Sequence, residues 1–333
     1  MDSVTQAVLG AAVGHTIAGR VLGKKALGVG AILGTLPDLD VIFVPLYDPV
    51  QQLAVHRGLS HSLLFCVLLS LFLALIFSRK WTTQMSFSRS FMMTFACLIT
   101  HVLLDACTSY GTLLLAPFSQ KRVAWDLISI VDPVYTLPML VGMIIGLWKS
   151  NYLRVSVLTG LVLSHAFLAL TIANKDKVDQ IFKQGAESEE IEYERMVTLP
   201  TGPGNILWYS VMQSADSLTI GEYSLWDSDN LPRFRSYARK TDLLQRVDDR
   251  NMVETMIWFS DGFFVMREHG NALRLYNLKC DMTGEADQGE APTKFFFELA
   301  KQDGSWTLDT GMHASESEEN SGWSDKFQRI MGN

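Results

Sequence analysis

Six apolar segments occupy the first half of the chain and are separated by short polar connections. They cover residues 3–22, 26–44, 60–77, 89–107, 133–149 and 151–173. The third, fifth and sixth are apolar enough to predict membrane helices. The first two are rich in Gly and Ala, which permit close helix packing and favour interior positions in a bundle. We therefore expect residues 1–174 to form a polytopic transmembrane bundle of about four to six helices.

The pattern changes after residue 174. A charged stretch at 175–194 is typical of a linker, and short runs rich in aromatic and β-branched residues follow it. Turn signals such as the Thr-Gly-Pro-Gly at 201–204 separate these runs, which predicts strands. One helical pattern lies within 231–249, at YARKTDLLQRV. We expect a small soluble α+β domain with an antiparallel sheet over 195–312 and a disordered tail over 313–333. The predicted fold class is mainly α.

Composition sharpens this division. The chain has 333 residues, is 48% hydrophobic and carries a net charge of −7. Only seven of its 35 acidic residues precede residue 175, and all seven are Asp, whereas five of its seven His lie there. The acidic balance and the lack of a basic stripe argue against a nucleic-acid partner. Four Cys without a CxxC spacing suggest neither a disulfide framework nor a thiolate zinc site. The first segment has no basic leader, so we expect a retained helix rather than a signal peptide.

Positive charges fall in alternate connections between the apolar segments. These charges are Lys24 and Lys25, then Arg79, Lys80 and Arg89, then Lys149 and Arg154. Such connections are typical of the cytoplasmic side of a membrane. The other connections hold most of the Asp and His and would then meet at the periplasmic side. Lys121 and Arg122 go against this trend. The sixth helix would deliver the soluble domain to the periplasm as well.

His101 and Asp105 lie four residues apart in an apolar helical run. This spacing places both side chains on one face of a helix. A His and an Asp in an apolar segment are costly unless they have a partner. The partner is either a metal ion or, across one helical turn, the other member of the pair.

A second cluster is the Pro37-Asp38-Leu39-Asp40 sequence. The proline ends or kinks the second helix and so exposes two carboxylates close to a helix end. Taken alone, such carboxylates are most often turn formers. In this setting, Asp38 and Asp40 are candidate metal ligands, or the general base for a metal-activated water.

A third cluster is HRGLSHS at 56–62, where a Gly permits a tight turn. Ser60 is expected to cap the third helix, with His61 in its first turn. His56 and His61 do not share a helical face, so either the turn brings them together or they bind different metals. The alternative is a capping motif with incidental histidines. Arg57 between them suits an anionic group such as phosphate.

Further candidates are less specific. Arg122 and Asp126 form either an i,i+4 ion pair or an anion clamp with another metal ligand. His15 is as compatible with a satisfied mid-helix histidine as with a ligand, and His165 indicates interior structure. Histidines with carboxylates and without cysteine favour zinc, manganese or iron. Two adjacent metals bridged by a carboxylate would activate water for displacement at phosphorus.

These motifs carry a resemblance. The matching sequences are TQAVLGA near the start, PDLD (37–40), HRGLSHS (56–62), HVLLD (101–105), PFS (117–119) with Arg122, and WDLISIVDP (125–133). On them, residues 1–145 resemble the YdjM/YbcI-like family of bacterial inner-membrane proteins, which is labelled as metal-dependent hydrolases. The WFSDGFF run at 258–264 is similar to a subgroup of that family with a C-terminal soluble domain.

The HxxxD sequence is also similar, more distantly, to zinc-dependent phospholipase C, in which that pair ligates zinc and the Asp bridges two metals. This resemblance implies that His101 and Asp105 hold the metals, completed by Asp38 or Asp40 and by His56 or His61. His15 would match an early histidine of that family. Two later ligand histidines have no counterpart here, so either Asp126 or Asp132 replaces them or the site holds fewer metals.

The combined expectation is a metal-dependent hydrolase of the bacterial inner membrane, with its site at the periplasmic face. It would act on a phosphoester or lipid-linked substrate through one or two divalent ions, zinc first and manganese or iron as alternatives. The expected metal ligands are His56, His61, His101, Asp105, Asp38, Asp40, His15 and Asp126, and the expected catalytic or anion-binding residues are Asp38, Asp40, Arg57 and Arg122. Its partners would be the lipid bilayer and the substrate. The rival interpretations are a non-enzymatic metal-binding scaffold or ion carrier, and a functional soluble domain on a helical anchor.

Overall fold

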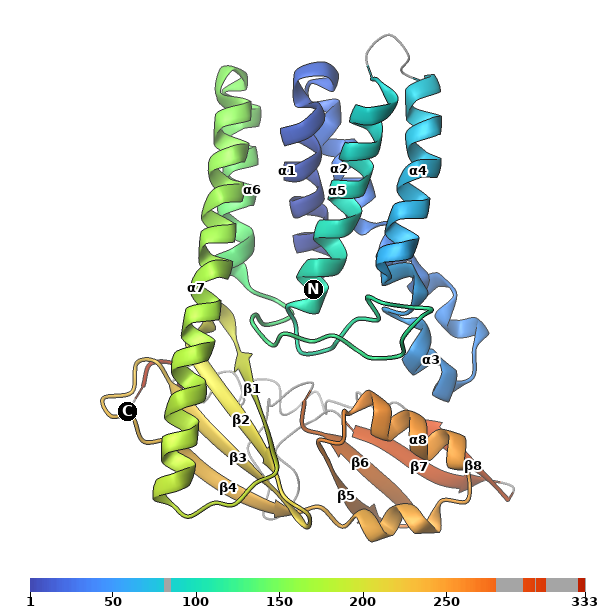
Figure 1. Ribbon diagram of the computed structural model, residues 1–333, viewed down its shortest axis with the longest axis vertical. Helices are drawn as coiled ribbons and strands as arrows, with labels where there is room; N and C mark the ends of the chain where they lie inside the picture. Colours follow the sequence, from blue (N-terminus) through green and yellow to red (C-terminus); the bar gives the residue numbers. More distant parts are fainter. Residues whose placement is uncertain (81–84, 280–295, 303, 310–328, 333) are drawn as a thin grey trace. The chain divides into compact units, whose positions relative to one another are not determined.

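The computed structural model describes residues 1–80, 85–279, 296–302, 304–309 and 329–332 (Figure 1). The chain divides into two compact units. The first comprises residues 1–46 and 55–172, and the second comprises residues 47–54 and 173–333. The last passage, from residue 172 to residue 173, lies within one long helix, α7 (Leu153–Ser188).

The first unit is built mainly of helices, as its apolar pattern predicts, with a non-helical segment between α5 and α6. Its longer helices are α1 (Ser3–Leu22), α2 (Lys25–Thr35), α4 (Leu63–Lys80), α5 (Phe87–Ala106), α6 (Pro133–Trp148) and the start of α7. Short 3₁₀ helices join them: η1 (Pro37–Ile42), η2 (Val44–Leu46), η3 (Leu59–His61) and η4 (Ser150–Tyr152). The helix α3 (Pro49–Val55) lies almost wholly in residues assigned to the second unit.

Three helices are long and apolar enough to cross a membrane. They are α4, α5 and the Ser150–Ser188 helix, and α2 with Pro37–Leu46 makes a fourth candidate that is bent by 49°. The shorter helix α6 has 16 residues. The predicted helical bundle is confirmed, and by length and composition the described residues supply three or four spans.

Glycine-mediated packing holds α1 and α2 together, as their small residues predict. A Cβ atom on Gly30 would collide with the carbonyl of Gly10, and one on Gly34 would lie 2.8 Å from the Gly10 Cα. Only glycine, which has no Cβ atom, permits the two helix backbones to approach this closely. α1 and α2 also lie beside α5 in the bundle (Figure 1), so this closely packed pair is positioned against α5.

The segment between α5 and α6 folds back over the end of α5 by main-chain bonds. Trp125 N donates to Ala106 O, and Leu63 N at the start of α4 donates to Leu114 O. Leu113 N donates to Arg57 O. These bonds fix residues 57–63 against the C-terminal end of α5.

The second unit is an α+β domain, and its described strands form two four-stranded antiparallel sheets (Figure 1). One sheet contains β1 (Arg195–Thr201), β2 (Leu207–Gln213), β3 (Ser217–Ser224) and β4 (Arg233–Ala238). The other contains β5 (Phe264–His269), β6 (Ala272–Asn277), β7 (Phe296–Gln302) and β8 (Ser305–Asp309). The turn η5 (Pro203–Asn205), the turn η6 (Thr241–Arg246) and helix α8 (Arg250–Phe259) connect strands.

Three local predictions are wrong. The expected linker is helical as far as Ser188, because Val178, Ile181 and Phe182 pack on Trp208 of the first sheet. The helix expected within 231–249 is divided among β4, η6 and the residues before α8.

The third concerns the start of α4. Ser62, not Ser60, accepts the hydrogen bond from Phe65 N, and α4 begins at Leu63. His61 consequently belongs to η3 and not to the first turn of α4. The tail expected to be disordered lies, apart from 329–332, outside the described residues.

Candidate metal centre

Four side chains from three elements converge inside the first unit. Asp38 comes from η1, His61 from η3, and His101 and Asp105 from α5, where their spacing of four places them on one face. One ligand atom from each lies within 4.8 Å of the others. The side chains of His61, His101 and Asp105 are fully buried, and that of Asp38 is 16% exposed. We call these four residues the metal cluster.

Five of the six distances among the ligand atoms of the metal cluster match the edges of a tetrahedron around a small ion. His61 Nε2 lies 3.3 Å from Asp38 Oδ1 and 3.3 Å from Asp105 Oδ2. His101 Nε2 lies 3.4 Å and 3.5 Å from the same two oxygens. The two Nε2 atoms are 3.2 Å apart. Zinc bonds of about 2.0–2.1 Å place tetrahedral ligand atoms about 3.3–3.4 Å apart, so the donor atoms fit such an ion.

Both imidazoles are held with Nε2 toward the centre of the metal cluster. His101 Nδ1 donates to the carbonyl of Gly34 at 2.5 Å, which leaves Nε2 as the ligand atom of the neutral ring. His61 Nδ1 lies 2.9 Å from Ser60 Oγ and 3.4 Å from Asp40 Oδ2. A carbonyl or carboxylate behind each imidazole is the usual arrangement for metal-bound histidine, because it fixes the ring and its tautomer.

Asp40 stands behind the metal cluster. Its carboxylate accepts from Arg57 N at 3.0 Å and from Ser60 Oγ at 2.7 Å. Its other oxygen lies 3.0 Å from His56 Nδ1. Because these groups and His61 surround both oxygens, Asp40 supports a ligand instead of belonging to the four-residue group.

The charges around Asp105 leave one oxygen directed at the cluster. Its Oδ1 accepts from Gln6 Nε2 at 3.0 Å, pairs with Arg57 Nη2 at 3.2 Å and contacts the Met1 amine. Its Oδ2 is buried and lies 3.3 Å from His61 Nε2 and 3.5 Å from His101 Nε2. While both imidazoles are neutral with Nε2 unprotonated, neither can donate to this oxygen. A buried carboxylate oxygen without a donor is costly, and a cation would satisfy it.

The raised pKa of His61 also indicates that the site favours a positive charge. Burial alone would lower the pKa of His61, but Asp105, Asp38 and Asp40 raise it to about 10. In the absence of a metal, the site therefore favours a proton on this ring. Metal ions compete with protons for such a nitrogen, so a divalent cation can supply the charge that these carboxylates require.

Two guanidinium groups gather on one aromatic ring beside the metal cluster. The Cζ atoms of Arg57 and Arg122 each lie 4.8 Å from the centre of the Tyr110 ring. Arg57 is 5% exposed and also donates to Thr108 Oγ1 at 3.0 Å. Arg122 is partly exposed. Arg57 thus balances the charge of Asp105, whereas Arg122 is the more accessible of the two cations.

The remaining predicted ligands are not part of the four-residue group. His15 is buried in α1, nine residues beyond Gln6, which corresponds to about 13 Å along a helix. Asp126 is buried in a non-helical segment, so the i,i+4 spacing does not place it on one face with Arg122. Asp132 caps α6 through Val134 N. His165, predicted to be interior, is exposed and bonds to Leu161 O in its own helix.

Sequence reasoning missed several supporting groups. The carbonyl of Gly34 has no side-chain signal, and Gln6 reaches Asp105 from a helix far away in sequence. The serine at position 60 was expected at a helix cap, yet it links Asp40 to His61. Only Gln6, a polar residue in an apolar segment, could have been singled out in advance.

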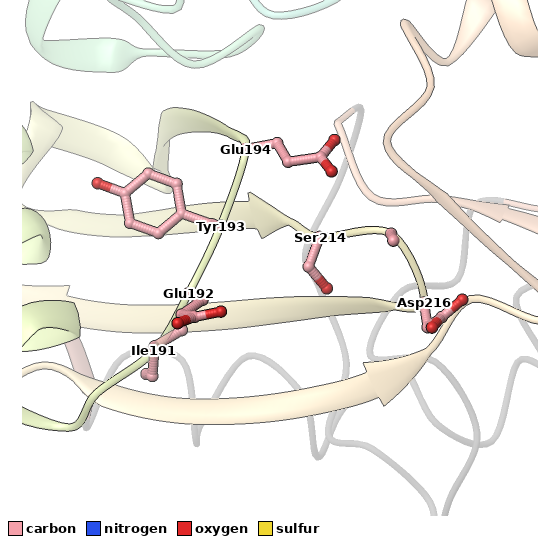
Figure 2. A pocket seen from close by; sticks show the side chains of 7 residues that line it. Ile191, Glu192, Tyr193, Glu194, Ser214 and Asp216 are labelled. Carbon is pink, nitrogen blue, oxygen red and sulfur yellow. The ribbon is translucent and has the colours of Figure 1, made fainter.

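The second unit has an open pocket of a different character. Figure 2 shows the carboxylate side chains of Glu192, Glu194 and Asp216 around it, together with Ile191, Tyr193 and Ser214. It has no His or Cys lining, and acidic surface groups alone do not define a metal site. The first unit holds the only grouping of three or more potential metal ligands among the described residues.

Known proteins resemble the part of the chain that contains the first unit. The model of the family described as YdjM inner membrane protein matches residues 1–178. A Bacillus subtilis protein described as uncharacterized protein YfhP is 30% identical over 158 residues, which cover 45% of this chain and 47% of that protein. The Escherichia coli inner membrane protein YbcI is 26% identical over 166 residues, 46% of this chain and 95% of that protein. The match thus spans about half the length of YfhP and nearly all of YbcI.

No solved structure matches the chain. The resemblance to zinc-dependent phospholipase C has no support in these comparisons.

Proposed function

The chain belongs to the YdjM inner membrane protein family, and from this premise we propose that it is a membrane-bound, metal-dependent hydrolase of phosphoester substrates. Asp38, His61, His101 and Asp105 would hold a divalent ion. Two nitrogen and two oxygen donors without sulfur suit zinc, with manganese or iron as alternatives. When bound, such an ion supplies an activated water and polarises a phosphoryl oxygen.

The observation that carries the proposal is the pairing of the metal cluster with two arginines on Tyr110. Arg57 neutralises Asp105 and is too buried to meet a large substrate. Arg122 is partly exposed, and its Nη2 group donates to the carbonyls of Tyr110 and Gly111. Because guanidinium geometry suits phosphate, Arg122 is the candidate for binding the anionic group of the substrate. A cationic group beside a metal favours a substrate with a negative charge at the reacting centre.

His56 and Asp40 supply a proton-transfer pair for this chemistry. His56 Nδ1 lies 3.0 Å from Asp40 Oδ1, and the His56 side chain is 27% exposed. A carboxylate on one imidazole nitrogen fixes the tautomer and leaves the other nitrogen for acid–base work. This assigns His56 and Asp40 roles other than the ligand roles expected from the sequence.

A non-enzymatic metal scaffold is the second candidate, and one observation favours it. Four protein side chains are available as ligands, as in structural zinc sites, whereas catalytic zinc usually retains an open position. Against the scaffold, Asp38 is partly exposed, and catalytic zinc can expand to five ligands.

The two candidates separate in one experiment. Purified protein, loaded with zinc or manganese in detergent, is assayed on a phosphomonoester and a phosphodiester. The hydrolase predicts turnover that His61→Ala abolishes and that His165→Ala leaves intact. Fully metal-loaded protein without turnover on either substrate would refute the hydrolase and favour the scaffold.

We also propose that the metal cluster and the second unit face the periplasm. Basic residues fall in alternate connections, including Lys24, Lys25, Arg79 and Lys80. These connections are on the opposite ends of the helices from the metal cluster, as expected for cytoplasmic loops.

A further inference from the structure

The metal cluster is open on one side only. Three of its four side chains are fully buried, and Asp38 is the one with measurable exposure. A reacting group must therefore approach past η1, the short helix that carries Asp38. The character of the chain around Asp38 determines which molecules can take this route.

That part of the chain is apolar and exposed. We define the entry segment as Leu39, Val41, Ile42, Phe43 and Leu46, whose exposed fractions range from 46% for Leu39 to 78% for Leu46. Contiguous exposed apolar side chains of this kind mark a contact with another apolar phase. Together with α2, Pro37–Leu46 is long and apolar enough to be a candidate membrane span.

The backbone of the entry segment suits a lipid environment. Leu39 N donates to Leu36 O, Phe43 N donates to Asp40 O, and Leu46 N donates to Phe43 O, at 2.9–3.2 Å. A chain that contacts hydrocarbon must satisfy its polar groups internally, and these 3₁₀ turns do so. The backbone of the entry segment can therefore lie in hydrocarbon.

Two basic residues, Lys121 and Arg122, supply positive charge on the same unit as the entry segment. Lys121 is exposed and Arg122 is partly exposed, and Arg122 shares the Tyr110 ring with Arg57 beside the metal cluster. Cations at a membrane surface attract anionic lipid headgroups. An apolar approach, a cationic surface and a metal cluster together select an amphiphile with a phosphate group.

We propose that the metal centre is entered laterally from the bilayer, and that its substrate is an anionic phospholipid. The headgroup phosphate reaches the metal cluster and Arg122, while the acyl chains lie along the entry segment. This deepens the proposed hydrolase function and rests on it for the reaction, whereas the lipid contact of the entry segment stands on its own geometry.

Site-specific labelling tests the lipid contact. Phe43→Cys is labelled with an environment-sensitive fluorophore in full-length Cys280→Ser protein, in which Cys66, Cys97 and Cys107 are buried. The protein is reconstituted in vesicles of phosphatidylglycerol and phosphatidylethanolamine with brominated acyl chains. Leu231→Cys, at a 64% exposed position of the second unit, is the matched control. Metal content equal to that of the unlabelled protein verifies the fold of each variant.

The lipid contact predicts quenching by brominated chains at position 43 and not at position 231. Quenching of both labels by aqueous iodide alone would overturn it. The substrate class is tested by comparing phosphatidylglycerol in mixed micelles with its deacylated glycerophosphodiester. Acyl chains should raise kcat/KM by roughly tenfold or more, because remote binding energy supports catalysis.

Equal kcat/KM for the two substrates would overturn the lipid preference and leave the hydrolase intact. Absence of turnover on both substrates would remove the hydrolase and with it the phospholipid substrate. In that case the quenching result still decides whether the entry segment contacts lipid.

Discussion

The Nε2 atoms of His61 and His101 face each other at 3.2 Å. The Nδ1 atom of His101 donates to Gly34 O, and that of His61 faces Ser60 and Asp40. In the neutral state, two nitrogen lone pairs would therefore meet and repel. A proton or a cation between them removes the conflict, and the nearby Asp38 and Asp105 oxygens favour the cation with the higher charge.

Asp40→Asn should weaken metal binding without abolishing it. The variant keeps the shape of the side chain but lowers the negative charge behind His61. Loss of such a supporting group typically reduces metal affinity by about 10- to 100-fold. Competition titration with a chromophoric chelator measures the change. Asp48→Asn, which retains a capping group for Val50 N, is the control and should bind as the wild type does.

Gly34→Ala should destabilise the first unit by about 1–3 kcal/mol, the usual range for overpacking. The added methyl group would meet the Gly10 backbone and displace the carbonyl that holds His101. Thermal unfolding in detergent and metal content should both fall. Gly28→Ala is the matched control on the same helix, because a Cβ there meets nothing within 4 Å. Equal losses in both variants would contradict this interpretation of α1–α2 packing.

Arg57 and Arg122 should respond differently to substitution. Arg57→Ala removes a buried partner of Asp105, and breaking a buried ion pair typically costs about 3–5 kcal/mol. Arg122→Lys keeps the positive charge but loses the planar fork that suits phosphate. The first change should lower the unfolding temperature. The second should chiefly raise KM for a phosphoester while the metal content is unchanged, and a normal KM would exclude Arg122 from substrate binding.

Reporter fusions at the C-terminus test the proposed orientation. Alkaline phosphatase should be active there, and a cytoplasmic fluorescent reporter should be dark. Fusions truncated after Lys80 should give the opposite result, since Arg79 and Lys80 lie in a predicted cytoplasmic connection. An inactive phosphatase at the C-terminus would contradict the periplasmic assignment of the second unit.

The sequence allowed the bundle and much of the metal cluster to be predicted, because both depend on local periodicity. The spacing of His101 and Asp105 places them on one face of α5, and the proline at 37 identifies Asp38 at a helix end. That Asp38 belongs to the metal cluster, whereas Asp40 supports His61 from behind, could not be predicted. It depends on the direction of successive side chains in a 3₁₀ helix and on where residues 56–62 fold against it.

Two other features could not be predicted, because they too depend on tertiary contacts. The charged residues after 174 resemble a linker, but Val178, Ile181 and Phe182 form an apolar stripe that the first sheet covers. The role of the Gly34 carbonyl depends on how closely α2 approaches α5, which no side chain encodes.

Metal content tests the central claim most directly. Protein purified in detergent and exchanged into metal-free buffer is analysed by mass spectrometry for bound zinc, manganese and iron. The wild type and His165→Ala should each hold one equivalent of a divalent ion after loading. His61→Ala and Asp105→Asn should lose most of it while their helical circular dichroism is retained. Full metal content in both cluster variants would contradict a metal centre at Asp38, His61, His101 and Asp105.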